Sequence, residues 1–127
     1  MKIEHFALQV ADPAAAADWY VRHLGFSVKR AVESPFCARY LADSDGAVML
    51  ELYRNPKVLV PQYRSMDPAL LHIAMLCDDL AGTIERLVEA GAVLVSGPVA
   101  LGEDFLATLR DPWGVAIQFV VRKQRLV

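Results

Sequence analysis

The sequence predicts an α+β fold that is built from two copies of one strand–helix–strand–strand–strand unit. The segment KIEHFALQVAD near the N-terminus returns as LHIAMLCDD in the second half of the chain, and each copy has a histidine near its start and an aspartate near its end. Glu51 follows His5, and Gln118 follows His72, at the same distance of 46 residues. Two copies of one unit would therefore place these four side chains at two pairs of equivalent positions.

The first unit is expected to begin with a strand and a helix. Residues 3–10 alternate, and the face with more apolar bulk is expected to pack under a helix, which leaves His5 on the opposite face. Asp12 followed by proline is typical of a helix start, and Gly25 is typical of the residue just after a helix end. Three further strands are expected at residues 26–32, 36–42 and 47–53.

The second unit is expected to repeat this order. A strand is predicted at residues 70–77, and Asp79 is predicted to cap a helix that ends at Gly91. The Gly97-Pro98 pair is expected to close the strand that follows. The remaining strands of this unit are expected at residues 92–96, 105–110 and 115–121.

The length and composition predict one compact domain. A globular chain of 127 residues, 55% hydrophobic and 22% charged, is large enough to bury most of its apolar surface. The stretch between the two units contains three prolines and no clear periodicity, which is typical of a linker. The expected single domain, residues 1–127, therefore divides into module 1 at about 1–54, a linker at about 55–69, module 2 at about 70–122 and a tail at 123–127.

The charge pattern excludes several classes of partner. The net charge is −2 and no basic stripe is present, so no nucleic acid partner is expected. No apolar run approaches the roughly 18 residues of a membrane span, so no membrane partner is expected either. Charges within the first ten residues are unlike a signal peptide, and the expected location is cytoplasmic.

Five features together resemble the vicinal oxygen chelate superfamily, the group of glyoxalase I, bleomycin resistance protein and extradiol dioxygenase. They are His5, the segment WYVRHLGF, the strand VMLELY with Glu51, His72, and the segment RDPWGVAIQF. The resemblance implies two βαβββ modules that form an open, barrel-like curled mixed sheet with the helices outside. It also implies a single site whose metal ligands come from the first and last strand of each module. Transferred to this chain, those ligands are His5, Glu51, His72 and Gln118.

The residue types in this set suit a divalent cation. Glu51 interrupts an apolar strand, where an ionised carboxylate costs several kcal/mol unless it meets a cation, donors or water. The set contains no thiolate, so Zn, Ni, Co, Mn or Fe would fit and the ligands alone do not choose among them. The alternative is that the same groups line a solvent-filled cavity that holds an organic ligand and no metal.

The leading functional hypothesis is a metal-dependent lyase or isomerase that acts on a small α-oxygenated carbonyl compound through an enediolate, with Glu51 as the catalytic base. Gln118 occupies the position at which glyoxalase I enzymes carry a glutamate, and an amide does not take up a proton near neutral pH. This departure argues against lactoylglutathione lyase activity itself. The first alternative is a non-catalytic drug or metabolite binding protein of the bleomycin resistance type. The second is a metal-dependent thiol transferase or dioxygenase.

A small molecule is the expected partner, and the resemblance and the apolar composition favour a homodimer. The modules would then pair either within one chain or across two chains, and the sequence leaves both open. Arginines on or beside the pocket strands are candidates to hold an anionic substrate, and aromatic residues near the strand ends are candidates to contact it. These substrate-binding candidates are Phe36, Arg39, Phe105, Arg110 and Trp113.

Overall fold

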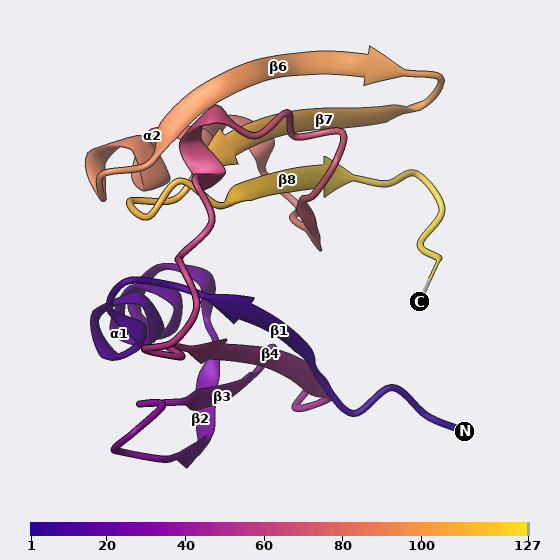
Figure 1. The fold of residues 1–127 in the computed structure, drawn as a ribbon. Coiled ribbons are helices and arrows are strands. Elements are labelled where there is room, and N and C mark those ends of the chain that lie inside the picture. Colours follow the sequence, from indigo (N-terminus) through magenta and orange to yellow (C-terminus); the bar gives the residue numbers. More distant parts are fainter. Residues whose placement is uncertain (127) are drawn as a thin grey trace. The chain divides into compact units, whose positions relative to one another are not determined.

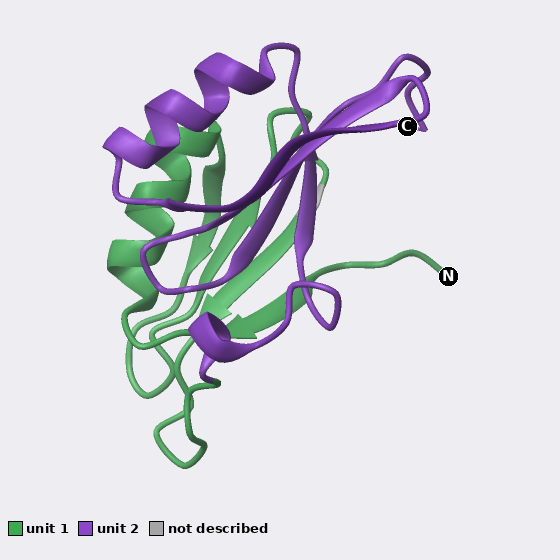
Figure 2. Ribbon diagram, turned by 90° about the horizontal axis from the view of Figure 1, so that it is seen from above, with its two compact units in different colours: residues 1–61 green, residues 62–127 purple. Residues whose placement is uncertain are grey.

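The computed structural model describes residues 1–126, apart from the side chain of Val48 (Figure 1). The chain forms two compact units that meet in sequence between Pro61 and Gln62 (Figure 2). Each unit contains one α-helix and one four-stranded sheet, which confirms the predicted α+β class and the duplicated order of elements. The predicted tail at 123–127 extends to Val127, which lies outside the described residues.

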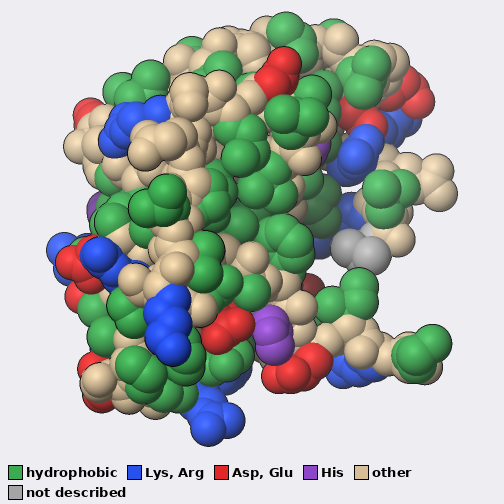
Figure 3. Space-filling model, in the orientation of Figure 1, with side chains coloured by type: hydrophobic (Ala, Val, Ile, Leu, Met, Phe, Trp, Pro, Cys, Tyr) green, Lys and Arg blue, Asp and Glu red, His purple; other side chains and the backbone are tan. Residues whose placement is uncertain are grey.

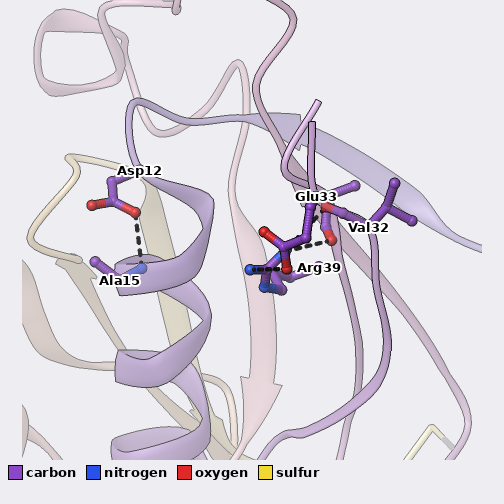
Figure 4. Close-up of polar contacts among 6 residues, drawn as sticks. Asp12, Ala15, Val32, Glu33 and Arg39 are labelled. Carbon is purple, nitrogen blue, oxygen red and sulfur yellow. Dashed lines mark hydrogen bonds and ion pairs between the residues drawn. The ribbon is translucent and has the colours of Figure 1, made fainter. Parts of the chain in front are cut away.

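The first unit begins with a strand and a helix, as predicted. Its strands are ordered β1-β4-β3-β2, with β1 parallel to β4 and the other pairs antiparallel. Asp12 caps the helix by accepting a hydrogen bond from the backbone N–H of Ala15 at 3.0 Å (Figure 4). The elements are β1 (Phe6–Gln9), α1 (Pro13–Leu24), β2 (Ser27–Ala31), β3 (Arg39–Ala42) and β4 (Val48–Tyr53).

The second unit has the same topology, with strand order β5-β8-β7-β6 and β5 parallel to β8. Asp79 caps its helix through the backbone N–H of Gly82, at 3.0 Å. The predicted linker contains a short 3-10 helix, η1 (Tyr63–Ser65). The other elements are β5 (Ile73–Leu76), α2 (Leu80–Glu89), β6 (Val93–Leu101), β7 (Asp104–Arg110) and β8 (Ala116–Val121).

Each helix packs on one face of its own sheet. In the first unit, Tyr20 of α1 is fully buried together with Leu41 of β3 and Leu52 of β4. In the second unit, Leu87 of α2 is buried with Leu109 of β7. Burial of a side chain of this size contributes roughly 1.5–3 kcal/mol relative to exposure. These contacts fix which face of each sheet stays free of the helix, and that face carries the candidate site.

The predicted start of each first strand is wrong by three residues. β1 begins at Phe6 and β5 begins at Ile73, so both histidines precede their strands by one residue. The parallel ladder of the first unit starts with Phe6 opposite Leu50, next to Met49, whose φ of 151° interrupts regular strand geometry. A strand can extend only as far as its partner offers regular backbone groups, which the alternation of side chains does not reveal.

The predicted end of the sixth strand is also wrong, because β6 continues through the Gly97-Pro98 pair to Leu101. The pairing with β7 shifts its register on both sides of Ser96. At such irregularities, residues are left out of the regular ladder of hydrogen bonds between the strands. Proline lacks the N–H that this ladder needs, so it is tolerated there. The strand therefore bends at this pair and does not stop there.

Replacing Gly97 by alanine is expected to lower the free energy of unfolding of the second unit by about 1–3 kcal/mol or more. Gly97 has a φ of +92°, and a Cβ at this position would lie 2.6 Å from the carbonyl oxygen of Leu106 in β7. Gly102 in the same hairpin is the matched control, because its φ is +63° but no atom lies within 4 Å of an added Cβ. Urea unfolding should show a clearly larger loss for Gly97→Ala than for Gly102→Ala, and equal losses would contradict the close approach of β6 and β7.

Neither helix in the described part of the chain has the length and apolar character that crossing a bilayer requires. Basic side chains are scattered over the face drawn in Figure 3 and do not gather into one stripe.

Candidate functional site

Both units carry a histidine and a glutamate or glutamine at equivalent register positions. Ala7 of β1 lies beside Glu51 of β4, and Ala74 of β5 lies beside Gln118 of β8. In each unit the histidine stands two positions before this alanine and one residue ahead of the strand, and in the first unit its ring reaches the glutamate. The equal spacing of 46 residues in the sequence thus corresponds to the same place in two sheets.

The pair in the first unit is in direct contact. The Nε2 atom of His5 lies 3.4 Å from the Oε2 atom of Glu51, and these side chains are 34% and 15% exposed. The Nδ1 atom of His5 lies 3.1 Å from a carboxylate oxygen of Glu4. Both ring nitrogens of His5 face a carboxylate, which only accepts hydrogen bonds, so the single proton of the neutral ring is donated either to Glu4 or to Glu51. When Nδ1 donates to Glu4, the lone pair of Nε2 faces Glu51.

This arrangement suits a cation between His5 and Glu51. The contact is favourable when a proton on Nε2 or a metal ion lies between this atom and the carboxylate oxygen. Two ligands of a tetrahedral ion with bonds of about 2.1 Å are separated by about 3.4 Å. The distance between these two atoms has the same value. The spacing of these two atoms is therefore compatible with two ligands of one ion.

Tyr40 adjoins the same carboxylate. It lies directly opposite Glu51 in the pairing of β3 with β4, so the two side chains leave the same face of the sheet. Hydrogen bonding toward Glu51, followed by burial and by the negative charge of Glu51, raises the pKa of Tyr40 above its ordinary value. The Tyr40 ring also meets the His5 ring edge to face, with 5.6 Å between centroids.

In the second unit the histidine is oriented by a backbone group. The Nδ1 atom of His72 lies 2.8 Å from the carbonyl oxygen of Pro68, which can only accept a hydrogen bond. The proton therefore sits on Nδ1, and the Nε2 atom of the neutral ring is left with a lone pair. Metal-binding histidines commonly have their other nitrogen fixed in this way. The Pro68 carbonyl oxygen thus fixes the tautomer of His72, whereas His5 has a carboxylate at each ring nitrogen.

A cavity of about 270 Å³ lies in the second unit beside Gln118. Gln118 pairs with Thr108, and Thr108 pairs with Ser96, which forms a polar row across β8, β7 and β6. The rest of the wall is mainly apolar. The lining residues are Ser96, Val99, Ala100, Leu101, Leu106, Ala107, Thr108 and Gln118.

Arg39, a predicted substrate-binding residue, forms its hydrogen bonds and its ion pair with neighbouring residues of the first unit. It donates hydrogen bonds to the carbonyl oxygens of Val32 and Ala38, both at 3.1 Å, and pairs with Glu33 at 3.0 Å (Figure 4). Strand alternation places it on the opposite face of β3 from Tyr40, toward the helix side of the sheet. These contacts hold the loop between β2 and β3 and leave the substrate-binding prediction for Arg39 without support.

Arg110 likewise binds backbone groups. Its guanidinium donates to the carbonyl oxygens of Tyr63, Gly114 and Met66, at 2.7, 2.9 and 2.6 Å. It thereby fastens the η1 segment and the turn before β8 to the second sheet. The structure brings none of the five predicted substrate-binding residues to the cavity beside Gln118. Phe36 and Phe105 are exposed, and Trp113 is half-buried in the turn before β8.

The sequence did not identify Ser96 and Thr108 as site residues, nor the contact of Tyr40 with Glu51. Register shifts in β2 and β6 change which residues face the site, and no local pattern marks them. Among the described residues, no three side chains of the His, Cys, Asp and Glu types lie close enough together to form a metal-binding group. The metal-ligand predictions for His5, Glu51, His72 and Gln118 therefore stay predictions.

Comparison with known proteins identifies the family. The family model of the Glyoxalase/Bleomycin resistance protein/Dioxygenase superfamily matches residues 2–119, and the chain belongs to this superfamily. The resemblance inferred from the sequence is thus confirmed. The chain is similar to a lactoylglutathione lyase from Haemophilus influenzae, with 30% identity over 97% of this chain and 94% of that protein.

Solved structures show the same fold. A glyoxalase family protein from Bacillus cereus matches with a TM-score of 0.82 and 20% identity, over 95% of this chain and 93% of that one. TnmS3, an antibiotic binding protein from a Streptomyces species, matches with a TM-score of 0.66 and 21% identity, over 94% of this chain and 93% of that one. At these identities the likeness concerns the fold.

Proposed function

We propose that this protein is a glyoxalase-like enzyme that uses a divalent metal ion in lyase or isomerase chemistry on a small α-oxygenated carbonyl compound. The observation that carries the proposal is the contact between His5 Nε2 and Glu51 Oε2 at 3.4 Å. The similarity to a lactoylglutathione lyase supports the reaction class. The homodimer and the cytoplasmic location predicted from the sequence stay predictions.

Each unit would supply one imidazole nitrogen and one side-chain oxygen to the ion. His5 and Glu51 are the ligands from the first unit, and His72 and Gln118 are those from the second. Zn, Ni, Co, Mn and Fe all accept such ligands. When bound, the ion would act as a Lewis acid that stabilises negative charge developing on the substrate oxygens.

Glu51 is proposed to move the proton. It is the only carboxylate of the four, so it would take a proton from the carbon next to the substrate carbonyl and return it to the neighbouring carbon. The amide of Gln118 binds through its oxygen and does not take part in proton transfer near neutral pH. Acid–base chemistry is therefore assigned to the first unit and substrate contact to the second.

The cavity beside Gln118 supports a small organic substrate. Its volume of about 270 Å³ leaves room for a molecule larger than a single water. Apolar walls with a few polar groups are typical of small-molecule sites. The Thr108 and Ser96 hydroxyls are available to bind neutral oxygen atoms of the substrate.

Metal analysis tests the proposal. Protein purified without chelator is expected to hold about one divalent ion per chain, measured by elemental analysis after dialysis. His72→Ala is expected to lose this ion, because an alanine offers no ligand. His23→Ala is the matched control, since His23 lies on α1 against Trp19 and outside the proposed ligand set. A wild-type protein that takes up none of the five metals would contradict the proposal.

The second candidate is a small-molecule binding protein without chemistry. The neutral lining of the second unit's cavity favours it, because apolar walls and hydroxyls bind an organic ligand without a metal. The fold shared with an antibiotic binding protein is compatible with this function. Binding of an organic ligand by metal-free protein, with no uptake of metal, would favour this candidate.

A further inference from the structure

We propose that Tyr40 is a positioning residue whose hydroxyl donates a hydrogen bond to the Glu51 carboxylate and holds it toward His5. The inference rests on the proposed function, because Tyr40 would affect metal binding and proton transfer only by orienting Glu51.

The strand pairing brings Tyr40 to Glu51. The two residues are direct partners on the antiparallel strands β3 and β4, so their side chains leave the same face of the sheet. Direct partners have Cβ atoms about 4.5–5.5 Å apart, which allows a long side chain to reach its neighbour. A tyrosine at this position is long enough to direct its hydroxyl toward the Glu51 carboxylate, and the raised pKa of Tyr40, caused first by hydrogen bonding toward Glu51, agrees with this direction. Glu51 presents Oε2 to His5, and Tyr40 approaches from the neighbouring strand.

The tyrosine ring is held by two further side chains. His5 meets it edge to face, with 5.6 Å between ring centroids. Arg30, the partner of Tyr40 on β2, places its guanidinium carbon 6.0 Å from the ring centroid. Edge-to-face and cation–π contacts of this kind each contribute about 0.5–1 kcal/mol at partly exposed sites. The hydroxyl is therefore presented to Glu51 by a ring with restricted freedom.

The second unit provides an internal comparison. At the positions equivalent to Tyr40 and Arg30, it has Thr108 opposite Gln118 and Ser96 opposite Thr108. Neither of these short side chains offers an aromatic ring or a positive charge. The duplicated fold thus places a donor on an anchored ring only next to the carboxylate, where the orientation of an acid–base group matters.

The test uses Tyr40→Phe, which removes the hydroxyl and keeps the ring. Tyr53→Phe is the matched control, because Tyr53 lies on the same face of β4 two residues from Glu51. Affinity for Co²⁺, measured by competition with a chelating dye, is expected to fall by about 10–100-fold in Tyr40→Phe. In turnover, kcat should fall while KM changes little, as for an interaction needed in the transition state. The control should match the wild type in each measurement, and equal effects in both variants would overturn the inference.

A double-mutant cycle separates this inference from the proposed function. Urea midpoints are measured in excess chelator for Tyr40→Phe, Glu51→Ala and the double variant. Tyr40→Phe is expected to lower the midpoint when Glu51 is present and to leave it nearly unchanged in the Glu51→Ala background. Equal shifts in both backgrounds would overturn the inference. If the cycle is non-additive but the protein binds no metal, the proposed function is overturned. The interaction of Tyr40 with Glu51 is then still supported.

Discussion

Glu51→Gln is expected to lower the rate of substrate proton exchange by roughly 10²–10⁴-fold. The substitution preserves the shape of the side chain and an oxygen that can bind a cation, but it removes the group that takes up the proton. The contacts with His5 and Tyr40 identify the position at which this loss would act. Both proteins are assayed with the metal ion in excess, so that the loss reports on proton transfer and not on metal loading.

The measurement is incorporation of deuterium from D₂O into small α-oxygenated carbonyl compounds, followed by proton NMR. A suitable panel includes dihydroxyacetone, hydroxyacetone and the hemithioacetal of methylglyoxal with glutathione. Glu85→Gln on the exposed face of α2 is the control for loss of one carboxylate, and it should behave as the wild type. A Glu51→Gln protein that exchanges protons at the wild-type rate would exclude Glu51 as the base.

The position of Glu51 could be predicted because two long-range regularities agree. The equal spacing of histidine to glutamate and of histidine to glutamine has a structural counterpart in the pairs Ala7–Glu51 and Ala74–Gln118. The number of residues between two positions does not depend on where a strand is predicted to begin. The error of three residues in the starts of β1 and β5 therefore did not affect this comparison. A duplicated chain therefore reveals equivalent positions even where its element boundaries are misjudged.

The neighbours of Glu51 could not be predicted in the same way. They depend on the register of β2 and β3, as the neighbours of Gln118 depend on that of β6 and β7, and a slip of one residue moves every side chain to the opposite face. Shifts near Arg30 and Ser96 are of this kind. The backbone contacts of Arg110 depend on where the η1 segment lies, which no periodic pattern encodes. Local irregularity thus limits which side chains can be assigned to the site from the sequence.

Exchanging the two residues, as Glu51→Gln together with Gln118→Glu, is expected to restore proton exchange at least about tenfold above Glu51→Gln alone. The reason is the equivalence of the two positions, each of which lies in the fourth strand of its unit beside the first strand. A carboxylate at position 118 would be able to take up the proton in place of Glu51, while glutamine at position 51 would keep an oxygen for the ion.

Recovery should be partial, because Thr108 at the second position lacks the aromatic ring with which Tyr40 adjoins Glu51. Adding Thr108→Tyr to the exchanged pair tests this point directly, provided that the larger side chain leaves the urea midpoint unchanged. Gln118→Glu alone is the control for the added charge, since it retains Glu51. An exchanged protein that folds and binds metal but is no faster than Glu51→Gln would show that equivalent register does not give equivalent chemistry. The acid–base role would then belong to the first unit through its own surroundings, with Tyr40 and Arg30 as the side chains that distinguish it from the second unit.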